Sequence, residues 1–371
     1  MQREQSDRPS LPVGPASSDG HSAHSVDSDR GRGGERDSTP VGTRRVHSRI
    51  VGTGHYAPQR VLTNRELERT VDTSDAWIVE RTGIRERHIA AEGEASSDMA
   101  AAAARDALAA AGISATELDL IIIATISPDQ PLPSTAVFVQ QKIGARSDCP
   151  AFDIAAACAG FIYGLSIADK FIASGAARHV LVVGVELLSR VVNWKDRTTC
   201  VLFGDGAGAA VLSASDGMRG LLSTHIYADG SQAAALQIPA GGSATPASVL
   251  SVEAGLHYVH MAGQDVFKYA VRALSSASLT ALEANGVSKD DVTWVVPHQA
   301  NLRILEAVSK RTGIELSRFV LNIARYGNTS SASIPIALDE AVRLGTIREG
   351  DLVLMCALGA GFAWGSALIR F

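Results

Sequence analysis

The feature that most constrains the fold of this chain is an internal repeat. Residues 101–125 (AAAARDALAAAGISATELDLIIIAT) and residues 275–299 (SSASLTALEANGVSKDDVTWVVPHQ) align at one fixed offset. Each segment is typical of a helix that ends at a glycine, Gly112 or Gly286, and is followed by an apolar strand, because glycine readily forms the left-handed cap after a helix. The repeat predicts two halves with one order of elements.

A second pair of segments continues the repeat. Residues 153–175 parallel residues 322–345, and each segment is followed by a run rich in β-forming residues, HVLVVGVE or DLVLMCAL. Alternating strands and helices predict a largely parallel sheet in each half, covered by helices. The helix after Cys158 is apolar on almost every side, so we expect it to be buried between the sheets. We therefore predict an α/β fold with two similar βα halves, residues 48–216 and 217–371.

Composition separates an N-terminal extension from the rest of the chain. Residues 1–47 are rich in Ser, Gly, Asp and Arg and almost free of large apolar side chains, so we predict that they are disordered. The extension has no apolar run typical of a secretory signal, and no later stretch is long and apolar enough to span a bilayer. The net charge of −5 is too mild to indicate nucleic-acid binding. We therefore expect a cytoplasmic protein that binds neither membranes nor nucleic acid.

One of the four cysteines has unusual neighbours. Cys149, Cys158, Cys200 and Cys356 show no CxxC spacing, which fits a reducing compartment and argues against a zinc site. Cys158, in DIAAACAGF, is flanked by the smallest side chains, which leave room for a substrate. At the start of a helix, unpaired amides and the macrodipole would lower its thiol pKa below the reference of about 8.5 and make it a nucleophile. The alternative is a small buried core cysteine.

Two residues of the second half could complete a site with Cys158. His298 follows the strand VTWVVP, at the carboxyl end where parallel sheets place their sites, and Asn328 lies near the start of the second central helix, equivalent to Cys158. Taken singly, these two residues could be a loop histidine and a turn or capping asparagine. Taken together with the thiol, they provide two hydrogen-bond donors and no carboxylate. That set suits stabilisation of an enolate as carbon dioxide leaves.

Two other motifs carry less functional weight. The segment GDGAGAAVL, residues 204–212, is similar to a phosphate-binding glycine loop, but an apolar strand follows where a helix is needed, so we predict a role in backbone packing. His257 and His260 in HYVH have no evident third ligand, so we predict no metal site.

Seven segments together resemble the beta-ketoacyl-[acyl-carrier-protein] synthase III family, the thiolase-fold condensing enzymes that start type II fatty acid synthesis. They are TSDAWIVERTGIRERHIAA, CPAFDIAAACAGF, FGDGAGAAVL, MAGQDVFK, VPHQANLRI, YGNTSSAS and WGSALIRF, and the resemblance covers about residues 48–371. It implies a thiolase-like duplicated fold with α-β-α-β-α layers and buried central helices. It also implies a homodimer without a cofactor that condenses an acyl-CoA with malonyl-[acyl-carrier-protein] (malonyl-ACP) to give β-ketoacyl-ACP, CoA and carbon dioxide.

The resemblance also implies roles for individual residues. Cys158 would take the acyl group from acyl-CoA, and His298 and Asn328 would bind the thioester oxygen of malonyl-ACP during decarboxylation. The backbone amides of Cys158 and Ala360 would form the oxyanion hole, although glycine is usual at the second position. The other implied contacts are Thr73, Trp77, Arg81, Arg197, Gly263 and Asn301 for CoA, Leu132 and Phe203 for the acyl pocket, and Lys268, Gln299, Arg303, Lys310 and Arg311 for the carrier protein.

The resemblance leaves the primer and the pathway open, as well as whether malonyl-CoA can replace malonyl-ACP. Leu132 stands at a position that is often Phe in the family and is contributed across the dimer interface, so we expect acceptance of primers beyond acetyl. One alternative is a condensing relative of secondary metabolism. Another is an acyltransferase without condensation, which would need a carboxylate where Asn328 stands. A third is a non-catalytic subunit of a condensing pair, which would be expected to lack Cys158.

Overall fold

The computed structural model describes residues 47–215, 217 and 219–371. The predicted N-terminal extension, residues 1–47, lies outside the described residues except for His47. That residue already belongs to strand β1 (His47–Tyr56), so the first strand begins one residue earlier than the predicted boundary. The division of the remaining chain after residue 216 stays a prediction.

The first sheet is built from the N-terminal half of the chain. Its strand order is β1-β7-β6-β4-β5. β4 pairs in parallel with β5 and β6, whereas β7 pairs antiparallel with β6 and β1. The sheet is therefore mixed, and the prediction of a largely parallel sheet is wrong for the antiparallel strands β1 and β7. Beside β1, the strands are β4 (Leu120–Ala124), β5 (Ala151–Ile154), β6 (His179–Glu186) and β7 (Gly206–Ser215).

The second sheet repeats this arrangement with strands from the C-terminal half. Its order is β11-β12-β13-β8, with β11 parallel to β12 and with β13 antiparallel to both β12 and β8. A parallel bridge between Val295 and Phe319 stands where β5 stands in the first sheet. Only residues 360–362 separate β12 from β13, and a turn this short joins antiparallel strands, which is why this sheet is also mixed. The strands are β8 (Gly220–Ala228), β11 (Trp294–Pro297), β12 (Leu352–Gly359) and β13 (Ala363–Arg370).

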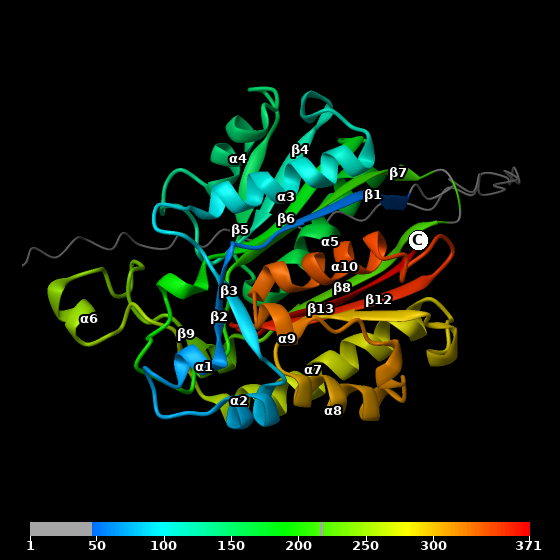
Figure 1. The fold of residues 1–371 in the computed structure, drawn as a ribbon. Helices are drawn as coiled ribbons and strands as arrows, with labels where there is room; N and C mark the ends of the chain where they lie inside the picture. Colours follow the sequence, from blue (N-terminus) through cyan, green and yellow to red (C-terminus); the bar gives the residue numbers. More distant parts are fainter. Residues whose placement is uncertain (1–46, 216, 218) are drawn as a thin grey trace, which may run out of the picture. The chain divides into compact units, whose positions relative to one another are not determined.

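Helices cover the outer face of each sheet and fill the space between the two sheets (Figure 1). α3 and α4 pack on the first sheet, α7 and α8 pack on the second, and α5 and α10 lie in the middle, where one apolar cluster contains residues of both sheets. This α-β-α-β-α stack confirms the predicted fold class. The helices are α3 (Ser96–Ala111), α4 (Thr135–Ile143), α5 (Gly160–Ala173), α7 (Gly263–Ala284), α8 (Leu302–Thr312) and α10 (Ser333–Arg343).

The repeat extends to the helix caps. Gly112 after α3 and Gly286 after α7 both adopt left-handed backbone conformations, with φ of 66° and 61°. In each half a serine two residues later closes a capping box on a short 3-10 helix, η1 (Ala115–Glu117) or η5 (Lys289–Asp291). The sequence pattern that predicted the duplication therefore corresponds to the same local hydrogen bonds in both halves.

The first central helix is buried for most of its length. Phe161, Ile162 and Leu165 of α5 have no exposed surface, as predicted. Phe171 is 38% exposed, so the expectation that the helix is buried between the sheets fails in its last turn. That turn also carries the exposed Lys170, and it reaches the surface of the molecule.

The second central helix packs closely against the first sheet. Pro335 is the third residue of α10, in the first turn, where the missing N–H of proline is tolerated. A Cβ on Gly208 of β7 would lie 2.6 Å from the backbone nitrogen of Ile336. This close approach supports the prediction that the segment 204–212 serves backbone packing.

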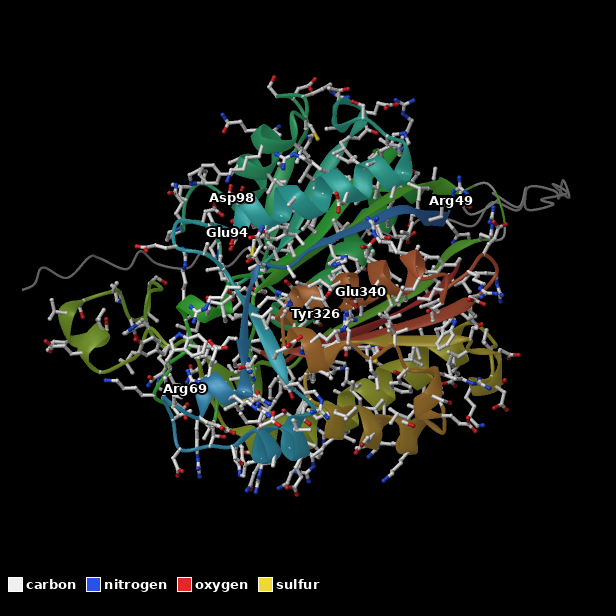
Figure 2. The ribbon with its side chains drawn as sticks, viewed as in Figure 1. Arg49, Arg69, Glu94, Asp98, Tyr326 and Glu340 are labelled. Atoms are coloured by element: carbon white, nitrogen blue, oxygen red, sulfur yellow. The ribbon has the colours of Figure 1, made fainter. Side chains whose placement is uncertain are left out.

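One of the smaller elements, α9 (Ile323–Tyr326), leads to Asn328. Tyr326 ends α9 and donates its hydroxyl to Glu340 of α10 at 2.8 Å, which ties the segment before Asn328 to the central helix (Figure 2). Within the described residues, no helix combines the length and apolar character needed to cross a membrane. The smaller helices and strands of the fold are α1 (Asn64–Leu67), α2 (Asp75–Thr82), α6 (Val249–Glu253), α9 (Ile323–Tyr326), β2 (Arg60–Thr63), β3 (Glu86–Ile89), β9 (Leu236–Gln237), β10 (His260–Met261), η3 (Leu188–Arg190), η4 (Gly230–Ala235) and η6 (Leu316–Arg318).

Candidate active site

Cys158 lies in a sharp turn at the start of the first central helix. The turn is the 3-10 helix η2 (Ala157–Ala159), which leads directly into α5. Ala157 has a φ of 45°, a left-handed conformation that is uncommon for a residue with a Cβ. A Cβ on Gly359 of β12 would lie 2.4 Å from the backbone nitrogen of Cys158. The nucleophile turn from the first half is therefore packed against the backbone of the second sheet.

The environment of the thiol opposes its ionisation. Burial raises the pKa of Cys158 to about 12, while the side chain of Ser330 acts as a hydrogen-bond partner that lowers it. The predicted lowering of the thiol pKa is therefore wrong in direction, because loss of water around the charged thiolate outweighs the favourable position at the helix start. The resting thiol is protonated at neutral pH, so its reaction as a nucleophile requires a proton acceptor.

His298 follows β11 and is held as a neutral ring. Its backbone N–H donates to the carbonyl oxygen of Cys356 at 2.8 Å, and its Nδ1 lies 2.7 Å from Oγ of Ser333. Oγ of Ser333 also accepts the backbone N–H of Gln299 at 3.3 Å, so its own proton is available to Nδ1. Burial lowers the pKa of His298 to about 3. In this arrangement the neutral ring carries its hydrogen on Nε2 and can donate it.

Asn328 is oriented by the turn that follows it. Its Oδ1 accepts the backbone N–H of Ser330 at 2.9 Å, and its backbone bonds with Leu202 and Gly204. Asn328 therefore also has the turn-stabilising role that the sequence suggested as an alternative. Because Oδ1 is engaged in the turn, the amide NH₂ is the part of the side chain left to donate to a ligand.

One cavity brings the three residues together. Cys158, His298 and Asn328 all line a cavity of about 100 Å³ between the two halves of the fold. Apolar side chains, including Phe203 and Leu358, form much of its remaining wall. The cavity therefore presents a thiol and two neutral hydrogen-bond donors in largely apolar surroundings. Such donors are more effective in these surroundings than in bulk solvent.

The cavity adjoins two further spaces. A space of about 390 Å³ on the outer side shares Gly263, Phe267 and Asn301 with the cavity. A space of about 280 Å³ on the other side shares Cys158 and Phe203 with it. The three spaces form one series, in which the space of about 390 Å³ is called the outer space and the space of about 280 Å³ the inner space. Cys158 lies where the cavity and the inner space meet.

The inner space is lined by one residue expected in the acyl pocket and one expected in the oxyanion hole. Phe203 and Ala360 line it together with Cys158. The non-glycine residues with positive φ in the described part of the chain are Ala157 and Ser330, so Ala360 fits the 360–362 turn without backbone strain. Leu132 is 83% exposed and lines none of the pockets described for this single chain. Its place in an acyl pocket stays a prediction.

Several expected CoA contacts gather at the outer end of the series. The guanidinium groups of Arg81 and Arg197 lie 4.7 Å and 5.4 Å from the ring centroid of Trp77. Asn301 donates its amide to the carbonyl oxygen of Arg81 at 3.0 Å, and both residues line the outer space with Gly263. Oγ1 of Thr73 is buried without a hydrogen-bond partner, which leaves it able to bind a ligand group.

The expected carrier-protein contacts divide into exposed cations and one buried amide. Lys268 comes from α7, whereas Arg303, Lys310 and Arg311 come from the neighbouring α8, and all four are exposed. Gln299 is 1% exposed, and its amide bonds with the backbone of Pro297, Val320, Asn322 and Ile323. The predicted contact of Gln299 with a carrier protein is therefore wrong, because a fully engaged buried side chain cannot meet a docking protein.

Three residues at the site escaped the sequence analysis. Ser333 orients His298, Ser330 lines a pocket together with Cys158, and Glu186 is a fully buried carboxylate that accepts a hydrogen bond from Ser330 at 3.1 Å. The hydroxyl-rich segment YGNTSSAS was the available signal for the two serines. Glu186 lies at the end of an apolar strand, where the sequence offers no clue to its neighbours.

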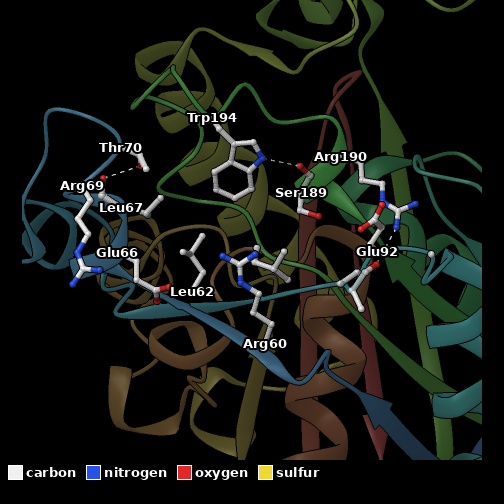
Figure 3. Close-up of a pocket in the computed structure, with 14 residues that line it drawn as sticks. Arg60, Leu62, Glu66, Leu67, Arg69, Thr70, Glu92, Ser189, Arg190 and Trp194 are labelled. Atoms are coloured by element: carbon white, nitrogen blue, oxygen red, sulfur yellow. Dashed lines mark hydrogen bonds between the residues drawn. The ribbon is translucent and has the colours of Figure 1, made fainter.

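The largest of the described pockets lies away from these residues. It measures about 690 Å³ and is lined by residues of β2, α1 and β3 and by the segment 189–194 (Figure 3). Arg60, Glu66 and Arg69 give it mixed charge, and the indole of Trp194 donates to the carbonyl oxygen of Ser189 at 3.0 Å. Its lining residues include no cysteine or histidine, so this pocket offers none of the chemistry described above.

The histidine pair in HYVH lies outside any cluster of candidate metal ligands among the described residues. Nε2 of His260 lies 3.2 Å from the carbonyl oxygen of Gly255. The described residues contain no group of three or more histidine, cysteine, aspartate or glutamate side chains arranged to hold a metal ion.

Comparison with known proteins gives consistent matches. The family described as 3-oxoacyl-[acyl-carrier-protein (ACP)] synthase III matches residues 152–230, and its C-terminal counterpart matches residues 282–371. Beta-ketoacyl-[acyl-carrier-protein] synthase III of Thiobacillus denitrificans is 53% identical over 329 residues, which are 88% of this chain and 100% of the relative.

Solved structures give the same result. The 3-oxoacyl-[acyl-carrier-protein] synthase III of Aquifex aeolicus VF5 is 48% identical with a TM-score of 0.81, over 87% of this chain and 100% of that chain. The priming beta-ketosynthase of the R1128 polyketide pathway is 37% identical with a TM-score of 0.81, over 88% of this chain and 97% of that chain.

Proposed function

Because the chain belongs to the beta-ketoacyl-[acyl-carrier-protein] synthase III family, we propose that Cys158, His298 and Asn328 carry out its condensation reaction. The protein is a condensing acyltransferase that initiates fatty acid synthesis, joining an acyl primer from acyl-CoA to malonyl-ACP with loss of carbon dioxide. The observation that supports these residue roles is the series of three adjoining spaces with Cys158 at the inner junction.

The first half-reaction transfers the acyl group to the enzyme. The sulfur of Cys158 attacks the thioester carbonyl of acyl-CoA, and the thiol proton is transferred to an acceptor. The backbone amides of Cys158 and Ala360 stabilise the tetrahedral oxyanion. The carbon–sulfur bond to CoA then breaks, CoA leaves as the thiol after taking up a proton, and the acyl chain occupies the inner apolar space.

The second half-reaction makes the new carbon–carbon bond. The thioester oxygen of malonyl-ACP accepts hydrogen bonds from Nε2 of His298 and the amide of Asn328, which stabilise the enolate formed as the carboxylate leaves as carbon dioxide. The enolate carbon attacks the acyl-cysteine carbonyl, and the Cys158 thiolate is released and takes up a proton. Neutral donors suit this step because they stabilise the enolate without readily protonating its carbon.

The test follows both half-reactions in one sample. Intact-protein mass spectrometry after mixing with acyl-CoA should show an acyl adduct that is absent from Cys158→Ala. Addition of malonyl-ACP labelled in its free carboxylate should then release labelled carbon dioxide and remove the adduct. An adduct that forms without subsequent release of carbon dioxide would contradict the proposal.

The exposed cations around the outer space suit acidic partners. The rings and cations of Trp77, Arg81 and Arg197 provide stacking and charge for a nucleotide end of CoA. Lys268 and Arg303 line the outer space, and Lys310 and Arg311 extend the charge along α8. We assign these cations to the carrier protein because charge complementarity guides encounter. Charge reversal at Lys310 and Arg311 should raise the KM for malonyl-ACP and leave acylation by acyl-CoA unchanged.

A homodimer would cover the apolar side chains left exposed on the single chain. Leu132 is 83% exposed, and Val249 and Leu250 of α6 are 73% and 77% exposed. Val252 of the same short helix is also 52% exposed, and neighbouring exposed apolar side chains of this kind mark interaction surfaces. Light scattering should give a mass twice that of the chain, and a monomer that is active at the same concentration would contradict the proposal.

Leu132 bears on the choice of primer if the dimer forms. A flexible aliphatic side chain in place of an aromatic one changes the shape of a pocket that it enters. We therefore expect acyl adducts from butyryl- to octanoyl-CoA as well as from acetyl-CoA, and Leu132→Phe should shift the preference toward acetyl-CoA. Absence of adducts from every primer longer than acetyl would contradict this assignment.

Acyl transfer without condensation is the alternative reaction class. Such a transferase would use a carboxylate to make His298 a strong base, but the partner of Nδ1 is the hydroxyl of Ser333. This contact favours condensation. We further propose that the enzyme works in the cytoplasm and needs no bound cofactor, since acyl-CoA is itself a substrate.

A further inference from the structure

Glu186 is a buried ionisable group without a role in the reaction described so far. It ends β6, has no exposed surface, and belongs to none of the ion pairs found among the described residues. A carboxylate buried without a cation is costly to keep, and such groups concentrate at functional sites. Its surroundings therefore bear on what it does.

The two oxygens of Glu186 face different surroundings. Oε2 accepts hydrogen bonds from Oγ of Ser127 at 2.6 Å, the backbone N–H of Ile126 at 3.2 Å and Oγ1 of Thr125 at 3.4 Å. Oε1 accepts from Oγ of Ser330 at 3.1 Å. One oxygen is thus anchored by the segment after β4, and the other points through one hydroxyl toward the active site.

Ser330 connects this carboxylate to the nucleophile. Ser330 and Cys158 both line the inner space, and the Ser330 hydroxyl lowers the pKa of the thiol against the larger effect of burial. The Ser330 φ of 49° is left-handed, an unfavourable conformation for serine that the surrounding contacts must maintain. In the hydrogen bond that the structure shows, the Ser330 hydroxyl donates to Glu186, so its oxygen keeps a lone pair that can take up the thiol proton.

We propose that Glu186 is the proton acceptor for Cys158, acting through the hydroxyl of Ser330. As the sulfur attacks the acyl-CoA carbonyl, the thiol proton passes to Oγ of Ser330 and the hydroxyl proton of Ser330 passes to Oε1 of Glu186. The carbon–sulfur bond to Cys158 forms, the bond to CoA breaks, and Glu186 returns its proton through Ser330 to the departing CoA thiolate. No oxidant or further reactant is needed. The proposal rests on the function assigned above.

The electrostatic setting supports this direction of transfer. His298 is a weak base, because burial lowers its pKa to about 3 and its Nδ1 is occupied by Ser333. Burial raises the pKa of Glu186 to about 7, against the hydrogen bonds of Ser127, Ile126 and Ser330 that lower it. The titratable group facing Glu186 is Cys158, and the other described contacts are hydroxyls and an amide. A base with a pKa near the working pH is the most effective one.

The experiment measures acylation of Cys158 against pH in wild type, Glu186→Gln and Ser330→Ala. Single-turnover mass spectrometry gives the rate constant for adduct formation from acyl-CoA between pH 5.5 and 9. In wild type the rate should rise with pH and level off above an inflection near 7, the pKa of Glu186. Both variants should lose this inflection and acylate about 100-fold more slowly at pH 7.5.

Two controls separate proton transfer from structural support. Thr125→Val removes a contact with Oε2 but leaves the path through Oε1 intact, so it should keep the wild-type pH profile. Decarboxylation of malonyl-ACP does not use the thiol proton, so Glu186→Gln should change it by less than about twofold. If wild type itself releases no carbon dioxide, the assigned function fails independently of Glu186.

Two results would overturn the role of Glu186. One is an unchanged inflection in the two variants, and the other is a loss in Thr125→Val as large as that in Glu186→Gln. If Glu186→Gln does not fold, Ser330→Ala decides between the outcomes.

Discussion

The two central helices begin with the same backbone turn but carry different chemistry. η2 before α5 contains Ala157 with φ of 45°, and η7 (Ser330–Ala332) before α10 contains Ser330 with φ of 49°. Counted from the helix starts, the counterpart of Cys158 is therefore Ser331, not Asn328 as the sequence repeat indicated. Counted back from the helix ends, Cys158 instead aligns with Asn328, because α10 is three residues shorter than α5, with 11 residues against 14.

This difference shows how the duplication has been divided between two tasks. The first turn places a thiol at the junction of two cavities, whereas the second turn carries hydroxyls and is preceded by Asn328. His298 reaches the same cavity from the end of β11. The first half thus provides the nucleophile, and the second half provides the donors that act on malonyl-ACP. If this division is correct, changes in one half should impair one half-reaction selectively.

The largest effect is expected from removal of the thiol. Cys158→Ala should abolish the acyl adduct and lower condensation by at least about 10,000-fold, because no other group can carry the acyl chain. Malonyl-ACP decarboxylation should persist, since His298 and Asn328 remain. Quantitative release of labelled carbon dioxide checks this, and loss of decarboxylation together with acylation would break the proposed division.

Removal of the histidine should impair decarboxylation and spare acylation, the reverse of the effect expected for Cys158→Ala. His298→Ala should lower decarboxylation by about 100- to 1,000-fold, the usual cost of losing one donor to a developing oxyanion. Acyl adducts at Cys158 should form at a rate close to that of wild type. Rate constants for both half-reactions from the same preparation give the measurement, and equal losses in both would contradict the comparison.

A smaller effect is expected from the residue that orients the histidine. Ser333→Ala removes the hydroxyl 2.7 Å from Nδ1 of His298 and lets the ring take either tautomer. Decarboxylation should fall by about tenfold, the value of one modest hydrogen bond. Ser333→Thr keeps the hydroxyl and should recover most of the rate, whereas equal losses in both variants would indicate a packing role.

The smallest effect concerns the pH dependence of decarboxylation. Burial lowers the pKa of His298 to about 3, so the ring stays neutral and active from pH 5 upward. We expect the decarboxylation rate of Cys158→Ala to change by less than about twofold between pH 5.5 and 8. An ordinary histidine would instead become protonated below about pH 6.5, and the rate would fall as the pH decreases. Acylation, in contrast, should depend on pH through Glu186.

The sequence predicted those features that depend on periodic pattern. The repeat indicated two similar halves, and the small residues around Cys158 indicated a ligand at that thiol. The pattern could not show that burial reverses the expected shift of the thiol pKa, because desolvation depends on atoms brought in by the fold. Glu186 and Ser330 are 144 residues apart, so only the fold reveals their contact. The predicted contact of Gln299 with the carrier protein failed for the same reason. A family resemblance identifies the equivalent position in the sequence, but it does not show whether the side chain there is exposed.

The most direct test of the divided site uses enzyme that is already acylated. Wild type and Asn328→Ala are loaded with labelled acyl-CoA, freed of CoA, and mixed with malonyl-ACP while the adduct and carbon dioxide are followed together. The account predicts that both proteins acquire the adduct, and that wild type loses it with one equivalent of carbon dioxide while Asn328→Ala retains it. Equal loss of the adduct and equal release of carbon dioxide in both proteins would contradict the account.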